Sequence, residues 1–178
     1  MIYLILILAL ILRLININQS LWLDEAINVL AAKDLGFIHF ITGYPIGDFH
    51  PPGYFLILWV VGHTFGFSEF FVRLPSVIFG VLTVYLTYLI GNKLVNEKIG
   101  LTAGLFLALN PLHIYYSQEA RMYAFSAFAV TLSFYFLIKL LEISGKFIFL
   151  YAFSIILVLY SDYVAYFALI PQFIYVLV

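Results

Sequence analysis

The sequence predicts an all-α membrane protein, with about six transmembrane helices and two interfacial helices in the first extracytoplasmic loop. Three observations lead to this prediction. Of the 178 residues, 65% are hydrophobic and only 10% are charged, whereas soluble domains carry roughly 25% charged residues. The apolar residues fall in runs of the length that membrane helices need. Nearly all charged residues lie at the ends of these runs, where water and headgroups can solvate them.

The apolar runs are 2–17, 53–67, 74–92, 99–116, 124–141, 147–160 and 163–178. The first run lacks a basic leader and a small-residue cleavage site, so we interpret it as a membrane helix rather than a signal peptide. The run 53–67 is short and is interrupted by Gly62 and His63, which favours a helix in the membrane interface. Residues 24–35 form a second surface helix, because apolar residues recur at helical spacing and Gly36 supplies a C-cap. Pro111 could break the run 99–116.

Short loops predict the topology. The connections 93–98 and 139–146 are flanked by lysines, which favours the cytoplasmic face. Segments 18–73 and 112–123 and the turn at 161–162 then face outside, with seven of the nine acidic residues, all but Glu97 and Glu142. Residues 1–178 are predicted to be the N-terminal part of one transmembrane domain: 1–17 as the first span, 18–73 as the outer loop with the surface helices, and 74–178 as five further spans. Arg13, late in the first span, is expected to snorkel outward.

Composition excludes several classes of function. The eight basic residues are scattered singly, so no basic stripe exists for nucleic acid. The chain has no cysteine, which excludes disulfides, thiolate metal sites and cysteine nucleophiles.

The outer segments hold the residues that carry chemistry. Asp24 and Glu25 are either helix-capping residues, or one is a general base while its neighbour holds a cation or an arginine. His50 precedes Pro-Pro-Gly, where an imidazole could bind phosphate or a metal. Arg73 and Arg121 fit either snorkelling at a helix end or bidentate binding of phosphate.

The order of four short motifs resembles the GT-C glycosyltransferases, and within them the branch of protein O-mannosyltransferases and aminoarabinose transferases. The motifs are Leu-Trp-Leu-Asp-Glu-Ala at 21–26, Phe-His-Pro-Pro-Gly-Tyr at 49–54, Glu-Phe-Phe-Val-Arg-Leu-Pro-Ser at 69–76, and Asn-Pro at 110–111 followed by Ser-Gln-Glu-Ala-Arg-Met-Tyr at 117–123. Each motif alone is weakly specific, but their order and spacing are more so. The resemblance extends from residue 21 to residue 166.

The resemblance implies a multi-pass protein of a plasma or ER-type membrane, with its active face extracytoplasmic. It implies transfer of a sugar, with inversion, from a polyprenyl (dolichyl or undecaprenyl) phosphate to a protein, lipid or glycan acceptor. Further spans and often a soluble domain follow in such relatives, so this part alone is expected to be inactive. Asp24 is the expected base with Glu25 beside it, and Arg73 is expected to pair with this acidic site.

The resemblance also implies the remaining site residues. Glu119 matches a second acidic position, which in oligosaccharyltransferase relatives helps to bind a divalent metal. Asp24 and Glu119 are therefore the expected metal ligands, although this chain has Glu-Ala-Arg in place of Asp-x-Asp. The expected substrate-binding residues are His50, Arg73, Arg121 and Tyr123.

Two other classes of function stay open. A transporter predicts ionisable residues within spans and broken helices at the midplane, and the position of most charges at span ends argues against it. A non-catalytic membrane scaffold predicts that Asp24 and Glu25 only cap a helix.

Overall fold

The computed structural model describes residues 1–142 and 145–177, which form helices with no strand among them. The helices are α1 (Ile2–Leu14), α2 (Leu23–Asp34), α3 (Phe37–Thr42), α4 (Tyr44–Asp48), α5 (Gly53–Phe65), α6 (Glu69–Leu94), α7 (Glu97–Leu109), α8 (Pro111–Tyr116), α9 (Tyr123–Glu142), α10 (Ile148–Ser161), the 3₁₀ helix η1 (Val164–Ala168) and α11 (Leu169–Leu177). The predicted all-α fold is confirmed. Within the predicted connection 139–146, residues 143 and 144 lie outside the described residues, as does Val178 of the last apolar run.

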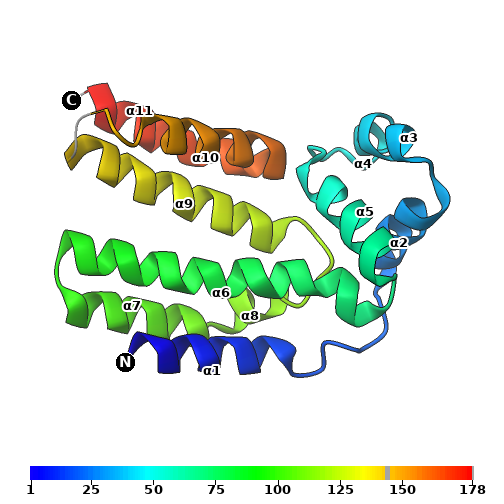
Figure 1. Ribbon diagram of the computed structural model, residues 1–178, viewed down its shortest axis with the longest axis horizontal. Coiled ribbons are helices and arrows are strands. Elements are labelled where there is room, and N and C mark those ends of the chain that lie inside the picture. The colour runs from blue at the N-terminus through cyan, green and yellow to red at the C-terminus, as the bar shows by residue number, and fades with distance from the viewer. Residues whose placement is uncertain (143–144, 178) are drawn as a thin grey trace.

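The long helices lie side by side, and the short helices gather at one end of them (Figure 1). Helix α6 packs on α1, α7 and α9, and α9 packs on α10. At the opposite end lie the N-terminus and the turn between α6 and α7. Helices α2 to α5, α8 and the first turn of α9 therefore share one end of the bundle, as the predicted topology requires. Helices were expected at 24–35 and 53–67 and are present as α2 and α5, although α2 is capped by Leu35, and Gly36 instead precedes α3. Their position in the membrane interface stays a prediction.

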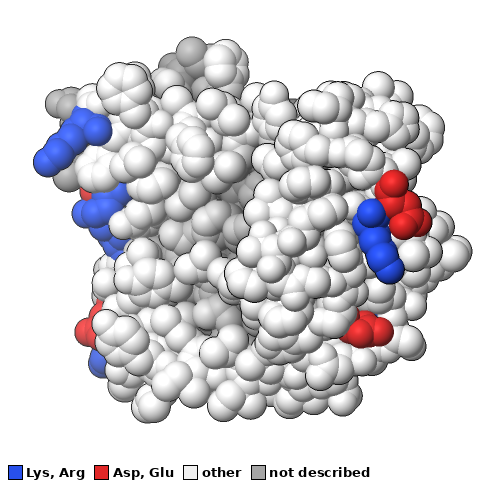
Figure 2. Space-filling model, turned by 45° about the vertical axis from the view of Figure 1, so that its right-hand side comes forward, with Lys and Arg blue, Asp and Glu red and all other residues white. Residues whose placement is uncertain are grey.

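The surface of the bundle is apolar between two charged ends. In Figure 2, charged side chains appear only at the two sides of the visible face, and the belt between them carries none. Helices α6 and α9, with 26 and 20 residues, are long and apolar enough to cross a membrane, and α1, α5, α10 and residues 164–176 are shorter apolar helices. Side chains such as Phe106 and Phe149 are 72% and 85% exposed. A bilayer is the solvent that suits such a belt.

The predicted run 99–116 does not form one continuous helix. Helix α7 ends at Leu109, and α8 begins at Pro111. Asn110 caps α8, because its Oδ1 accepts a hydrogen bond of 3.0 Å from the His113 amide, and proline suits the first helical position. The break turns the chain toward the end of the bundle that carries α2 to α5.

The expectation that Arg13 snorkels outward is wrong. Its side chain is fully buried and contacts only neutral groups among the described residues. Nε donates to Ser117 Oγ at 3.2 Å, Nη1 to the Ala108 carbonyl at 3.3 Å, and Nη2 lies 2.6 Å from His113 Nδ1. The Ala108 carbonyl belongs to the last turn of α7, where the helix dipole favours a cation. Arg13 therefore ties α1 to α7 and α8, and fixes the segment that leads to Glu119 and Arg121.

Candidate active site

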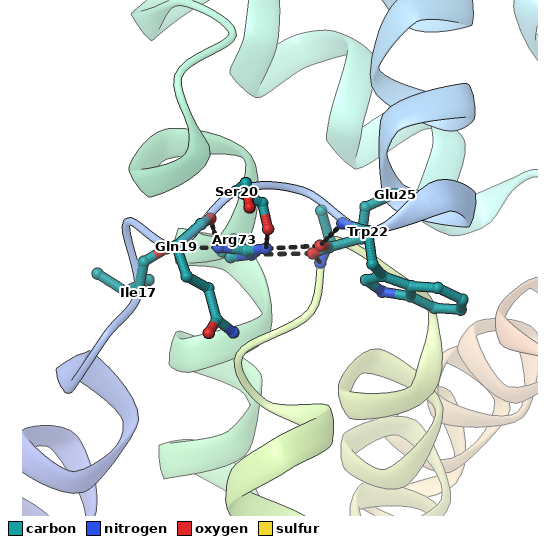
Figure 3. A network of polar contacts seen from close by, with 7 residues as sticks. Ile17, Gln19, Ser20, Trp22, Glu25 and Arg73 are labelled. Atoms are coloured by element: carbon teal, nitrogen blue, oxygen red, sulfur yellow. Dashed lines mark hydrogen bonds and ion pairs between the residues drawn. The ribbon is translucent and has the colours of Figure 1, made fainter.

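A buried ion pair lies at the end of the bundle that carries α2 to α5, here called the polar end (Figure 3). Arg73 Nε donates to Glu25 Oε1 at 2.9 Å, and Nη2 donates to Oε2 at 2.6 Å. Both side chains are almost completely buried. Two parallel bonds between a guanidinium and a carboxylate form the strongest geometry of such pairs. The pair joins α2 to α6.

The carboxylate of Glu25 has no acceptor position to spare. Oε1 also accepts from the Ala120 amide at 2.6 Å, and Oε2 accepts from the Trp22 amide at 3.3 Å. An ionised carboxylate offers about four lone-pair positions, and four donors occupy them here. Glu25 is the third residue of α2, so its bond to the Trp22 amide is the acidic half of a capping box. Glu25 thus acts as an anchor for α2, α6 and the segment around Ala120.

The guanidinium of Arg73 is equally committed to the protein. Nη1 donates to the carbonyls of Ile17 at 2.7 Å and Gln19 at 2.6 Å, and Nη2 also contacts the Ser20 carbonyl at 3.3 Å. These carbonyls follow α1, so Arg73 holds the first outer segment in place. The expected pairing of Arg73 with the acidic site is present, with Glu25 as the partner. The expected contact between Arg73 and substrate stays a prediction.

Asp24 lies beside this network and remains free of it. Its side chain is partly exposed, and it takes no part in the hydrogen bonds that surround Glu25 and Arg73. Its negative charge contributes to raising the pKa of Tyr44 in α4. Burial and the charge of Asp48 raise the pKa of Tyr44 to about 12, with a smaller contribution from Asp24 and an opposing one from Arg121. The charges of Asp24, Asp48 and Arg121 therefore all act on the same tyrosine.

A second charged cluster contains Arg121, Asp48 and His50. Arg121 Nη1 lies 3.7 Å from Asp48 Oδ1, and Asp48 Oδ2 lies 2.8 Å from His50 Nδ1. The Arg121 side chain is only 4% exposed, yet its Nε and Nη1 lack a hydrogen-bond partner among the described residues. Its guanidinium carbon lies 5.9 Å from the centre of the Tyr123 ring. A buried cation with unsatisfied donors is costly, and such a group needs an explanation.

The backbone between Asp48 and His50 is unusual. Phe49 adopts the left-handed conformation, with φ 60° and ψ 34°, which costs a residue other than glycine about 1–3 kcal/mol. This turn lets His50 Nδ1 reach both the carbonyl and the carboxylate of Asp48, each at 2.8 Å. Asp48 was not among the predicted site residues, although its position two residues before His50 was a usable signal. Strain of this kind is typical of functional sites.

Glu119 and Arg121 are separated in the chain by Ala120 alone. It is 5% exposed, and its Oε2 has no hydrogen-bond partner among the described residues. Burial raises the pKa of its carboxyl, and the Tyr115 hydroxyl opposes this shift. The part of the chain that the structure describes holds no group of three or more His, Cys, Asp or Glu side chains suited to a metal. The expected metal ligands Asp24 and Glu119 therefore stay a prediction.

Comparison with known proteins gave two matches. Residues 49–178 match the family model described as dolichyl-phosphate-mannose-protein mannosyltransferase. A dolichyl-phosphooligosaccharide-protein glycotransferase 2 of Pyrococcus horikoshii is 37% identical over 92 residues, which cover 46% of this chain and 12% of that relative. The chain thus spans only a small part of this curated relative. No solved structure matches the chain significantly.

Proposed function

The chain belongs to the dolichyl-phosphate-mannose-protein mannosyltransferase family of GT-C glycosyltransferases, and from this membership we propose that it forms part of a membrane enzyme that transfers sugar from a polyprenyl phosphate. The acceptor is a protein, lipid or glycan on the extracytoplasmic face. In this proposal α1, α6, α7, α9, α10 and the η1–α11 unit are the spans of a multi-pass domain, and α2 and α5 lie in the membrane interface. The family resemblance that the four motifs predicted is confirmed.

The unsatisfied guanidinium of Arg121 carries the proposal for the donor. A phosphate oxygen is the acceptor that its Nε and Nη1 lack, and bonds between guanidinium and phosphate are short and strong. His50 and Tyr123 belong to the same cluster. His50 contacts Asp48, which pairs with Arg121, and the Tyr123 ring contacts the Arg121 guanidinium. When the sugar leaves the carrier, negative charge develops on the phosphate, and a cation already positioned there stabilises that charge.

Asp24 is the base in the proposed reaction. Glu25 has its acceptor positions occupied, whereas the Asp24 carboxylate is free to take a proton from the acceptor hydroxyl. The acceptor oxygen bonds to the anomeric carbon as the bond from that carbon to the phosphate oxygen breaks. The bonding electrons leave with polyprenyl phosphate, beside Arg121. A single displacement of this kind inverts the anomeric centre. No step in this scheme runs through a metal.

A transporter is the second candidate, and two observations favour it. Arg13 is buried within α1, and the chain breaks between α7 and α8, as in transporters with discontinuous helices. Against it, the described contacts of Arg13 satisfy its guanidinium with neutral groups. Arg13 therefore has fewer free donors for a passing substrate than Arg121.

Replacing Arg121 with Met is expected to weaken binding of undecaprenyl phosphate by about tenfold or more, because hydrogen bonds to charged groups contribute about 1.5–3 kcal/mol. The measurement is titration of the purified protein in nanodiscs, followed by native mass spectrometry. Undecaprenol, which lacks the phosphate, should bind equally to both proteins.

Lys139→Met is the matched control, because the Lys139 Nζ lies 5.8 Å from the centre of the Tyr135 ring. Both substitutions remove a cation from an aromatic face, but Lys139 belongs to the opposite end of α9. Equal affinity of Arg121→Met and the unmodified protein for undecaprenyl phosphate would contradict the proposed donor site.

A further inference from the structure

A cavity at the polar end is separate from the Arg121 cluster. It has a volume of about 220 Å³ and is lined by residues that include Trp22, Tyr115, Gln118 and Glu119, with the Glu25–Arg73 pair as one wall. Neither Arg121 nor Asp48 lines it. The proposed donor-phosphate site therefore leaves this cavity without a role.

The cavity contains one acceptor that the protein does not satisfy. Glu119 is 5% exposed, and its Oε2 has no partner among the described residues. The Tyr115 hydroxyl, which also lines the cavity, already interacts with the Glu119 carboxyl, yet Oε2 remains without a partner. The other nearby donors are committed elsewhere. Gln118 Nε2 donates to the carbonyls of Leu12, Arg13 and Ile15 at 3.3, 3.2 and 2.6 Å. The Arg73 nitrogens donate to Glu25 and to carbonyls after α1. Oε2 of Glu119 is thus the acceptor that a ligand donor would satisfy, because leaving a buried acceptor unpaired is costly.

The charges around Glu119 favour a neutral donor over a metal ion. Arg73 and Arg121 are both close enough to lower the pKa of the Glu119 carboxyl, although burial dominates and raises it. Glu25, the other carboxylate of the cavity wall, is neutralised by Arg73. A divalent cation in the cavity would therefore meet the Arg73 guanidinium and only one carboxylate, Glu119, that no ion pair neutralises. A hydroxyl group can donate to Glu119 without this repulsion.

The remaining wall suits a ligand with an apolar face. The Trp22 side chain is 42% exposed although it lines the cavity. An indole offers a large flat surface with a polar edge, on which the C–H face of a sugar ring or a short aliphatic chain can pack. A carboxylate acceptor next to an exposed indole matches a hydroxyl-bearing ligand.

We propose that the cavity between Trp22 and Glu119 is a hydroxyl-binding subsite, in which Glu119 accepts a hydrogen bond from a substrate hydroxyl that packs on Trp22. The identity of that substrate rests on the proposed function. The hydroxyl belongs either to the transferred sugar or to the acceptor.

The short backbone distance between Glu119 and Arg121 favours the transferred sugar over the acceptor as the source of this hydroxyl. Glu119 and Arg121 flank Ala120, whose amide is bound to Glu25, so one hydrogen bond sets the position of both side chains. Their Cα atoms are separated by at most about 7 Å. A hexose with its phosphate is long enough to reach both groups, with the phosphate at Arg121 and a ring hydroxyl at Glu119.

Trp22 itself can report on this subsite. The chain has two tryptophans, so Trp59→Phe leaves Trp22 as the sole indole. In this background, purified protein in nanodiscs is titrated with methyl α-D-mannopyranoside and, separately, with N-acetylserinamide. A saturable change in Trp22 fluorescence is expected with at least one of them. Glu119→Leu should weaken that response at least tenfold, and the isosteric Glu119→Gln should weaken it less. Glu69→Leu, at the start of α6 and outside the cavity, is the matched control and should leave it unchanged.

Each outcome has a defined meaning. A response to the mannoside assigns the subsite to the transferred sugar, and a response to N-acetylserinamide assigns it to the acceptor. A response to Mg²⁺ or Mn²⁺ alone, or no saturable response, would overturn the proposal. Binding of undecaprenyl phosphate to Glu119→Leu is measured in parallel. If carrier binding still depends on Arg121 while Trp22 shows no response, the hydroxyl subsite fails and the proposed function stands. If the Trp22 response is normal but carrier binding is independent of Arg121, the proposed donor site fails and the hydroxyl subsite stands.

Discussion

In the full-length enzyme, Asp24→Asn is expected to lower the rate of sugar transfer by about 10²- to 10⁴-fold, which is the usual contribution of a positioned general base. The amide has nearly the same shape as the carboxylate but cannot accept the proton of the acceptor hydroxyl. Since the Asp24 side chain is partly exposed and the buried network is made by Glu25 instead, the fold should not depend on the charge of Asp24. The measurement is transfer of radiolabelled sugar from the polyprenyl carrier, with carrier binding and thermal unfolding followed on the same preparations.

Asp34→Asn is the matched control for this experiment. Asp34 is an exposed carboxylate at the last position of the same helix, so its substitution makes the same chemical change away from the site. Transfer should be unaffected. Near-normal transfer by Asp24→Asn would remove Asp24 as the base, and the scaffold reading, in which it only caps α2, would gain support.

The second large effect is expected on stability. Removing one partner of the buried pair, as in Glu25→Leu or Arg73→Met, should lower the free energy of unfolding by about 3–5 kcal/mol, because the remaining charge is buried without compensation. The double variant Glu25→Leu/Arg73→Met should lose less than the sum of the single variants, because neither charge remains. Unfolding in mixed detergent micelles, followed by circular dichroism, provides these free energies.

The ion pair between Lys93 and Glu142 is the control for burial. Its Nζ–Oε2 distance is 2.7 Å, close to that of the buried pair, but the two side chains are 36% and 40% exposed. Lys93→Met should cost less than about 1 kcal/mol, as exposed pairs do. If the losses for Lys93→Met and Arg73→Met are similar, Glu25 and Arg73 do not anchor the polar end.

The sequence predicted the elements whose pattern is local. Helix α2 was expected from its apolar spacing, and α5 from a short apolar run after Pro51-Pro52. The roles of Asp24 and Glu25 could not be separated in the same way. Successive residues of a helix point in directions about 100° apart, so packing against α6 decides which carboxylate meets Arg73. Only the tertiary structure therefore assigns Glu25 to the ion pair and leaves Asp24 free.

Other features depend on contacts that no local pattern reveals. Arg13 was misplaced because a run that is apolar all round does not indicate which side faces the bundle. Helices α3 and α4, with six and five residues, are too short to show a period, and helices of this length depend on tertiary packing. Asp48, at the end of α4, was consequently missed as the link between Arg121 and His50.

The proposed active site requires α2 and the α8–α9 segment to lie on the same, extracytoplasmic face of the membrane, so the first measurement is which side of the membrane each segment faces. The chain has no cysteine, so Lys33→Cys, Tyr115→Cys and Asn96→Cys each carry a single thiol, all at exposed positions. A membrane-impermeant thiol reagent is added to intact cells and then to opened membranes. The thiols at positions 33 and 115 are expected to react from outside, and the one at position 96 only after the membrane is opened. Reaction of positions 33 and 115 from opposite sides would place Asp24 and Arg121 on different faces and contradict the proposed active site.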